Sequence, residues 1–254
     1  MGGVGKTTLV DHVYKIVKLD FDAAAWVTVS KSYQFEDLLK RIAREFSIVT
    51  DATNMEIRGL VEIIRKHLEG KRYILVLDDV WEKDVWINNI MEVFPTNCTS
   101  RFVLTSRNFE VASLATSNCR IELEPLGDKH SWELFCKAAF RNSDDKRCPS
   151  ELQDLAVKFL QKCEGLPIAI ACIGRLLSVK QPTYSEWDSV YKELELQSSN
   201  NVMQGVNSIL KVSLEDLPYE LKNCFLRRVI TWKHCSSGAS RRSQQRFITF
   251  KQAS

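Results

Sequence analysis

The sequence predicts an α/β fold with a doubly wound parallel sheet, followed by a helical bundle. Three observations support this prediction. Residues 1–8 read MGGVGKTT, a phosphate-binding pattern that lacks only its leading glycine. Residues 74–81 read ILVLDDVW, an apolar run that ends in two acids. As far as residue 125, strand-like and helix-like segments alternate, as they do when helices connect parallel strands.

Apolar patterns mark each element of this N-terminal region. Helical spacing identifies the helices, and short runs rich in β-branched and aromatic residues identify the strands. The run at 72–79 is continuously apolar before its acids, which is typical of a parallel strand buried on both faces. The expected strands are 21–30, 72–79, 101–106 and a short one within 120–126. The expected helices are 9–17, 35–46, 57–68, 109–114 and one around 86–93.

The rhythm changes near residue 126, where strand patterns disappear. Residues 126–197 show four helical patterns and predict a helical bundle, with residues 1–125 as the α/β domain. Residues 202–226 predict two more helices, broken at a Leu-Pro pair. Residues 227–254 are basic and rich in Ser and Gln, without a clear period, which favours a disordered tail.

The composition is that of an ordinary globular protein, with 44% hydrophobic and 26% charged residues among 254. No apolar run approaches the roughly 18 residues of a membrane-spanning helix, and the charged N-terminus is unlike a signal peptide. The eight cysteines form no C-x-x-C pair. This pattern favours packed thiols in a reduced, cytoplasmic compartment over a disulfide or zinc framework.

The net charge of +3 is unevenly distributed. The last 34 residues hold eight basic residues and no acidic one, whereas residues 1–220 have a net charge of −5. The main body is therefore mildly acidic, and the overall charge does not indicate nucleic-acid binding. A nucleic-acid-binding tail is an alternative, but its few aromatic residues offer no organised stacking surface. We expect no specific nucleic-acid partner.

The N-terminal pattern has the chemistry of a phosphate-binding loop. Glycines let phosphate oxygens approach the backbone amides closely, and the dipole of the following helix favours negative charge. Lys6 is expected to reach the β- and γ-phosphates of a nucleotide, and the Thr7 hydroxyl to bind Mg²⁺. The alternative is a glycine-rich N-terminus that only resembles such a loop. The candidate phosphate-binding residues are Gly2, Gly3, Val4, Gly5, Lys6 and Thr7.

Two later segments add charged residues at strand ends. The carboxyl ends of strands in a doubly wound sheet meet at the ligand-binding crevice. Asp78 is the candidate for holding Mg²⁺ there, and Asp79 for orienting or deprotonating an attacking water. Arg107 follows the strand at 101–106 and could contact the γ-phosphate. The alternatives are a solvated strand end for the two acids and an ordinary surface position for the arginine.

Taken in order, these segments resemble the NB-ARC domain of plant nucleotide-binding leucine-rich-repeat resistance proteins. The resemblance covers roughly residues 1–226. The segments that carry it are GGVGKTT, FDAAAWVTVSKSY, KRYILVLDDVW, SRFVLTSR, LEPLGDKHSWELFCKAAF, CEGLPIAIACIGRLL and LEDLPYELKNCFL. The segment LDDVW ends in Trp81, and in this respect it resembles the coiled-coil class of these proteins rather than the Toll-receptor-like class.

The resemblance implies a P-loop NTPase of the STAND type, with slow ATP hydrolysis at most. Such a domain is a molecular switch in plant defense, resting with ADP and active and self-associating with ATP. The resemblance adds Thr8 to the phosphate site and makes Asp79 the catalytic acid and Arg107 the γ-phosphate sensor. It places Pro167 near the adenine; a plain helix-start proline is the alternative.

The sequence departs from the family pattern at both ends. The first P-loop glycine and the strand before it are missing, and that strand normally lies centrally in the sheet. After residue 226 the pattern of a winged-helix subdomain breaks off, so residues 202–226 are read as its start only. We therefore expect a truncated domain. A fragment that binds nucleotide poorly, and acts at most through interactions, is the alternative to a working switch.

Overall fold

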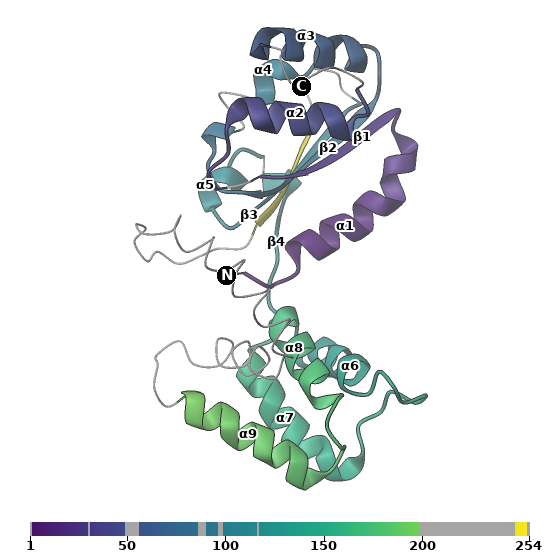
Figure 1. Cartoon of the computed structure of the whole chain (residues 1–254), viewed down its shortest axis with the longest axis vertical. Coiled ribbons are helices and arrows are strands. Elements are labelled where there is room, and N and C mark those ends of the chain that lie inside the picture. Colours follow the sequence, from purple (N-terminus) through teal and green to yellow (C-terminus); the bar gives the residue numbers. More distant parts are fainter. Residues whose placement is uncertain are drawn as a thin grey trace. The chain divides into compact units, whose positions relative to one another are not determined.

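The chain alternates strands and helices up to residue 123 and is helical from there to residue 198 (Figure 1). The structure is a computed structural model that describes residues 2–29, 31–48, 56–85, 90–95, 99–115, 117–198 and 247–252. These residues divide into two compact units. The first holds the residues up to Leu123 together with 247–252, and the second those from Glu124 to 198.

The first unit contains five strands and the helices that connect them. Its strands are β1 (Ala23–Thr28), β2 (Tyr73–Val80), β3 (Arg101–Ser106), β4 (Arg120–Glu122) and β5 (Phe247–Gln252). Its α-helices are α1 (Lys6–Val17), α2 (Phe35–Glu45), α3 (Ile57–Leu68), α4 (Met91–Val93) and α5 (Phe109–Ala112), and its short 3₁₀ turns are Lys18–Asp20 and Ser117–Cys119.

The strands form one sheet in the order β1-β2-β3-β5-β4. β1, β2 and β3 pair in parallel. β5 pairs antiparallel with both β3 and β4, so β4 runs in the same direction as the first three strands. Four strands of this sheet therefore run in one direction, and β5, which lies between β3 and β4, runs in the opposite direction.

Helices cover both faces of the sheet, because alternate strand residues point to opposite sides. Tyr73, Leu75 and Leu77 of β2 join the core beneath α2 and α3. Ile74 and Val76 join a smaller apolar cluster with α1. Figure 1 shows α1 on one side of the sheet and α2 and α3 on the other. This arrangement brings the carboxyl ends of β2 and β3 to the start of α1.

The described part of the second unit consists of four α-helices and one short 3₁₀ turn. Its core is aromatic: the buried Trp187 ring lies 5.9 Å from that of Phe135 and 6.3 Å from that of Phe159. Gly174 permits close helix packing, because a Cβ atom there would lie 2.5 Å from the Ala138 Cβ. The helices are α6 (Asp128–Ala139), α7 (Gln153–Cys163), α8 (Pro167–Leu177) and α9 (Tyr184–Ser198), with a 3₁₀ turn at Ser150–Leu152.

The structure confirms the predicted α/β fold with a parallel sheet and flanking helices. The expected start of a further subdomain at 202–226 lies outside the described residues. Within the tail 227–254, whose composition favours disorder, residues 247–252 form β5. Among the described residues, no helix combines the length and the apolar character that crossing a membrane requires.

Candidate functional site

The N-terminal glycine-rich segment forms a tight turn directly before α1. Gly3 and Gly5 have φ angles of 82° and 99°, which side chains with a Cβ rarely adopt. Gly5 caps α1, and its carbonyl accepts the Leu9 backbone N–H at 2.9 Å. Lys6 is the first residue of the helix and is buried. The backbone amides at this helix start therefore face a region suited to an anion.

The hydroxyl of Thr7 meets the end of β2. Its Oγ1 lies 2.9 Å from Asp78 Oδ1 and 3.2 Å from Asp78 Oδ2. Asp78 is 4% exposed, so its carboxylate has a fixed position. The two residues predicted to bind Mg²⁺, 71 positions apart in the sequence, are thus direct neighbours.

Asp79 lies at an irregularity of the sheet. Leu77 pairs with Leu104 and Val80 with Ser106, so β2 holds one residue more than β3 over this stretch. Asp79 adopts a φ of 58°, which is uncommon for a residue other than glycine. The extra residue turns the Asp79 side chain away from the regular alternation of the strand.

Thr105 of β3 supports both acids. Its Oγ1 accepts the Asp79 backbone N–H at 2.8 Å and donates to Asp78 Oδ1 at 2.6 Å. The buried hydroxyl therefore satisfies an amide that leaves the regular ladder and holds the neighbouring carboxylate. This residue is absent from the predicted site residues. The sequence signal that could have found it is a polar side chain that follows the apolar run 102–104, two residues before Arg107.

Arg107 binds Asp79 through two hydrogen bonds. Its Nε and Nη2 donate to Asp79 Oδ1 and Oδ2 at 3.2 and 3.1 Å, and both side chains are partly exposed. The guanidinium carbon also lies 5.0 Å from the centre of the Trp81 ring, and Lys31 Nζ lies 5.4 Å from it. Trp81 therefore helps to hold the arginine in place, a role that the sequence analysis did not foresee.

The glycine-rich turn and Arg107 are close in space. A Cβ atom built on Gly2 would lie 3.6 Å from Arg107 Nη1. The turn, the two acids and the arginine therefore form one site, to which three elements contribute: the start of α1 and the ends of β2 and β3.

The donor set of this site fits Mg²⁺ and a phosphate group. A hydroxyl and a carboxylate are hard oxygen ligands, and Mg²⁺ completes its shell with waters and phosphate oxygens. Among the described residues, no cluster of three or more His, Cys, Asp or Glu side chains could hold a metal alone.

Two of the predicted site residues take no part in the contacts described above. Thr8 is an exposed residue in the first turn of α1. Pro167 is the first residue of α8 in the second unit, where a proline suits the helix start. Val4 is buried at the turn itself.

Comparisons with known proteins identify the relatives of this chain. Residues 1–145 match the model of the NB-ARC domain. The chain is 39% identical over 238 residues to Disease resistance protein RPM1 of Arabidopsis thaliana, an alignment that covers 89% of this chain and 26% of the relative. It is 34% identical to Disease resistance RPP13-like protein 4 and 35% identical to Disease resistance protein RPP8, both of Arabidopsis thaliana. Those alignments cover 89% of this chain and 27% and 26% of the respective relatives, so the chain spans about a quarter of their length.

Proposed function

The chain belongs to the NB-ARC domain family of nucleotide-binding domains, and from this premise we propose that it binds ADP and ATP with Mg²⁺ as the switch domain of a plant immune receptor. The observation that carries the proposal is the contact between Thr7 and Asp78 beside the paired Asp79 and Arg107. Names of the related proteins support the role in disease resistance.

Each residue of the site has a proposed task. The amides of residues 2–5 and the Lys6 ammonium bind the phosphates, with Thr8 beside them. Thr7 and Asp78 hold Mg²⁺, which offsets the negative charge of the phosphates. In the second unit, Pro167 offers a rigid apolar surface for the adenine.

Arg107 is the candidate residue for distinguishing ATP, which has a γ-phosphate, from ADP, which lacks one. Both Asp79 oxygens accept hydrogen bonds from this arginine. We assign Arg107 as the group that detects the γ-phosphate, since a phosphate oxygen can compete with the Asp79 carboxylate for the guanidinium. A general base must be available to accept a proton, so an Asp79 held in this pair supports slow ATP hydrolysis at most.

The setting of the domain is part of the proposal. The five described cysteines Cys119, Cys136, Cys148, Cys163 and Cys172 are free thiols, which supports a reduced, cytoplasmic location. Self-association with ATP bound belongs to the full-length receptor, and nothing in the described site requires a nucleic acid.

A binding measurement with two lysine variants tests the proposal. Lys6→Ala removes the candidate phosphate ligand, and Lys15→Ala removes an exposed lysine of the same helix that pairs with Asp11. We expect Lys6→Ala to weaken binding of fluorescent ADP with Mg²⁺ by roughly 10- to 100-fold, because a charge-assisted contact contributes about 1.5–3 kcal/mol. Lys15→Ala should bind as the wild type does.

The same measurement separates the switch from its alternative. Equal and negligible nucleotide binding by the wild type and both variants would mean that the chain is an interaction fragment without a working nucleotide site.

A further inference from the structure

The strand β5 is unusual in its sheet, since it runs against both of its neighbours. Residues 252 to 247 pair with Arg101 to Ser106 of β3, and residues 249 to 247 pair with Arg120 to Glu122 of β4. β3 and β4 run in the same direction, and β4 joins the sheet through β5. A segment from the C-terminal end of the chain thus fills a slot between two strands from its N-terminal half. Figure 1 shows this strand in yellow.

Filling this slot satisfies buried backbone groups. β3 is buried along most of its length, from Phe102 to Ser106. On one edge it pairs with β2, and on the other with β5. Without a strand at the second edge, the outward amide and carbonyl groups of β3 would lose their partners, which is costly for buried groups. β4 would lose its attachment to the sheet altogether.

The slot lies next to the candidate nucleotide site. Ile248 and Phe247 pair with Thr105 and Ser106, the last residues of β3. The Thr105 side chain holds both acids of β2, and the Ser106 hydroxyl donates to the Val80 carbonyl at 2.6 Å. The backbone of the residues that position the acids is therefore bound on its free edge by β5.

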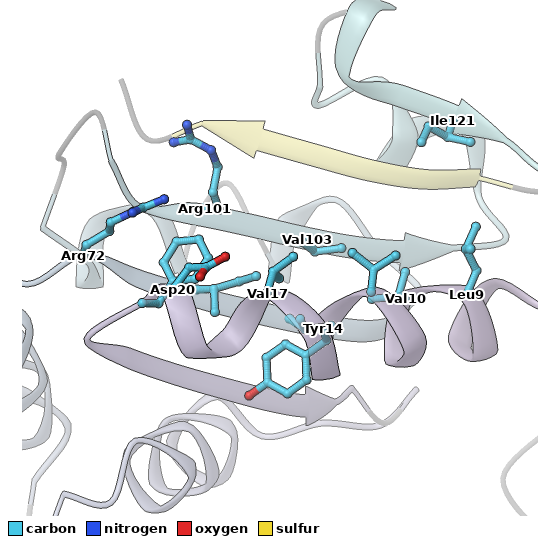
Figure 2. Close-up of a pocket in the computed structure, with 13 residues that line it drawn as sticks. Leu9, Val10, Tyr14, Val17, Asp20, Arg72, Arg101, Val103 and Ile121 are labelled. Atoms are coloured by element: carbon cyan, nitrogen blue, oxygen red, sulfur yellow. The ribbon is translucent and has the colours of Figure 1, made fainter.

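The face of the sheet under α1 borders a cavity beside the slot. This cavity of about 450 Å³ lies between α1 and the sheet, and its lining includes Val103 of β3 and Ile121 of β4. Figure 2 shows β5 as the yellow arrow between these two residues, with Val10 of α1 on the side of the helix that faces the sheet.

We propose that the gap between β3 and β4 is a strand-receiving slot, and that its occupant is the C-terminal segment 247–252 of this chain. Recognition rests on two backbone edges at once, a mode in which an added strand supplies main-chain hydrogen bonds on both sides. The sequence FITFKQ suits a strand with two paired edges, since its aromatic and β-branched residues favour an extended backbone. The C-terminal segment is therefore a structural part of the first unit.

Thr249 gives the sharpest test, because it pairs with Leu104 on one side and Arg120 on the other. Proline at this position removes the amide hydrogen and is not tolerated in a central strand. Thr249→Val keeps the amide and the branched shape, and it serves as the matched control. Hydrogen exchange of segments 101–106 and 120–122 is measured in the full-length chain without nucleotide, so the result does not depend on the proposed function.

We expect exchange in both segments to be roughly 10- to 100-fold faster in Thr249→Pro than in the wild type, the range that corresponds to one unpaired buried group. Thr249→Val should match the wild type. If Thr249→Pro fails to fold while Thr249→Val folds, the amide of this strand is required, which also supports the proposal. Equal protection of 101–106 and 120–122 in both variants would overturn it.

Discussion

At the scale of single residues, the candidate site depends on hydroxyl groups as much as on charges. Thr7 reaches the Asp78 carboxylate from the start of α1, and Thr105 reaches it from β3. Thr105 also accepts the amide of Asp79, whose φ of 58° takes it out of the regular ladder. The unusual backbone at the second acid therefore has a local partner that stabilises it.

Replacing Thr105 tests this support. Thr105→Val keeps the shape of the side chain but removes the hydroxyl, so the partly buried Asp79 amide and the buried Asp78 carboxylate each lose a hydrogen-bond partner. We expect the free energy of unfolding to fall by about 1–3 kcal/mol, measured by urea denaturation. Thr105→Ser keeps the hydroxyl and should recover most of that loss. Equal stability of Thr105→Val and the wild type would show that the hydroxyl holds neither acid.

The sequence was sufficient to select the charged residues of the site but not their pairing. Asp78 and Thr7 follow from the two motifs, and their contact follows from the rule that parallel strands end at one edge. The pair between Asp79 and Arg107 depends on the extra residue in β2, which no local pattern reveals. The contact of Trp81 with Arg107 is likewise set by tertiary structure.

At the scale of elements, the turn between α7 and α8 is constrained by close contact with the backbone at Leu126. Gly165 has a φ of 66°, and a Cβ atom there would lie 2.4 Å from the Leu126 carbonyl oxygen. The Gly165 carbonyl in turn accepts the Leu126 amide at 2.8 Å. Glycine is therefore needed for both the backbone conformation and the close approach.

Adding a methyl group at Gly165 should destabilise this unit. Overpacking costs about 1–3 kcal/mol, so we expect Gly165→Ala to lower the free energy of unfolding by at least that much. Gly127→Ala is the matched control, since nothing lies within 4 Å of a Cβ atom at this position. Its cost should stay within about 1 kcal/mol, the scale of a cap substitution. Similar urea midpoints for both variants would contradict the close approach.

Elements with strong local patterns could be predicted from the sequence, whereas the strand β5 could not. The strand at 101–106 was predicted with the bounds that β3 has, because an apolar run ends there in polar residues. β5 was missed, since its partners lie more than 120 residues earlier in the chain and the surrounding segment is basic and polar. Long-range pairing of this kind overrides what the neighbouring sequence indicates.

At the scale of the whole molecule, both units bury groups that resist ionisation. Burial raises the pKa of the Tyr73 phenol from 10.0 to about 12. Burial also raises the pKa of the Cys148 and Cys163 thiols from 9.0 to about 12. In the folded chain these groups keep protons that the unfolded chain releases at lower pH.

This difference predicts a loss of stability in alkali. Above about pH 9 the unfolded state binds fewer protons than the folded state, so the free energy of unfolding falls as the pH rises towards about 12. Urea denaturation at about pH 8 and about pH 10.5 should show the decline. The decline should be shallower in a variant with Cys148→Ala and Cys163→Ala. Equal stability at both pH values in the wild type would refute the assigned protonation states.

The most direct test of the proposed nucleotide site is to locate the ligand on the chain. Hydrogen exchange of the wild-type protein is compared with and without ADP and Mg²⁺, segment by segment. Binding at the turn before α1 predicts strong protection of residues 2–8, which grows with nucleotide concentration and is lost in Lys6→Ala. Nucleotide binding that leaves the exchange of residues 2–8 unchanged would contradict the assignment of this turn as the phosphate site.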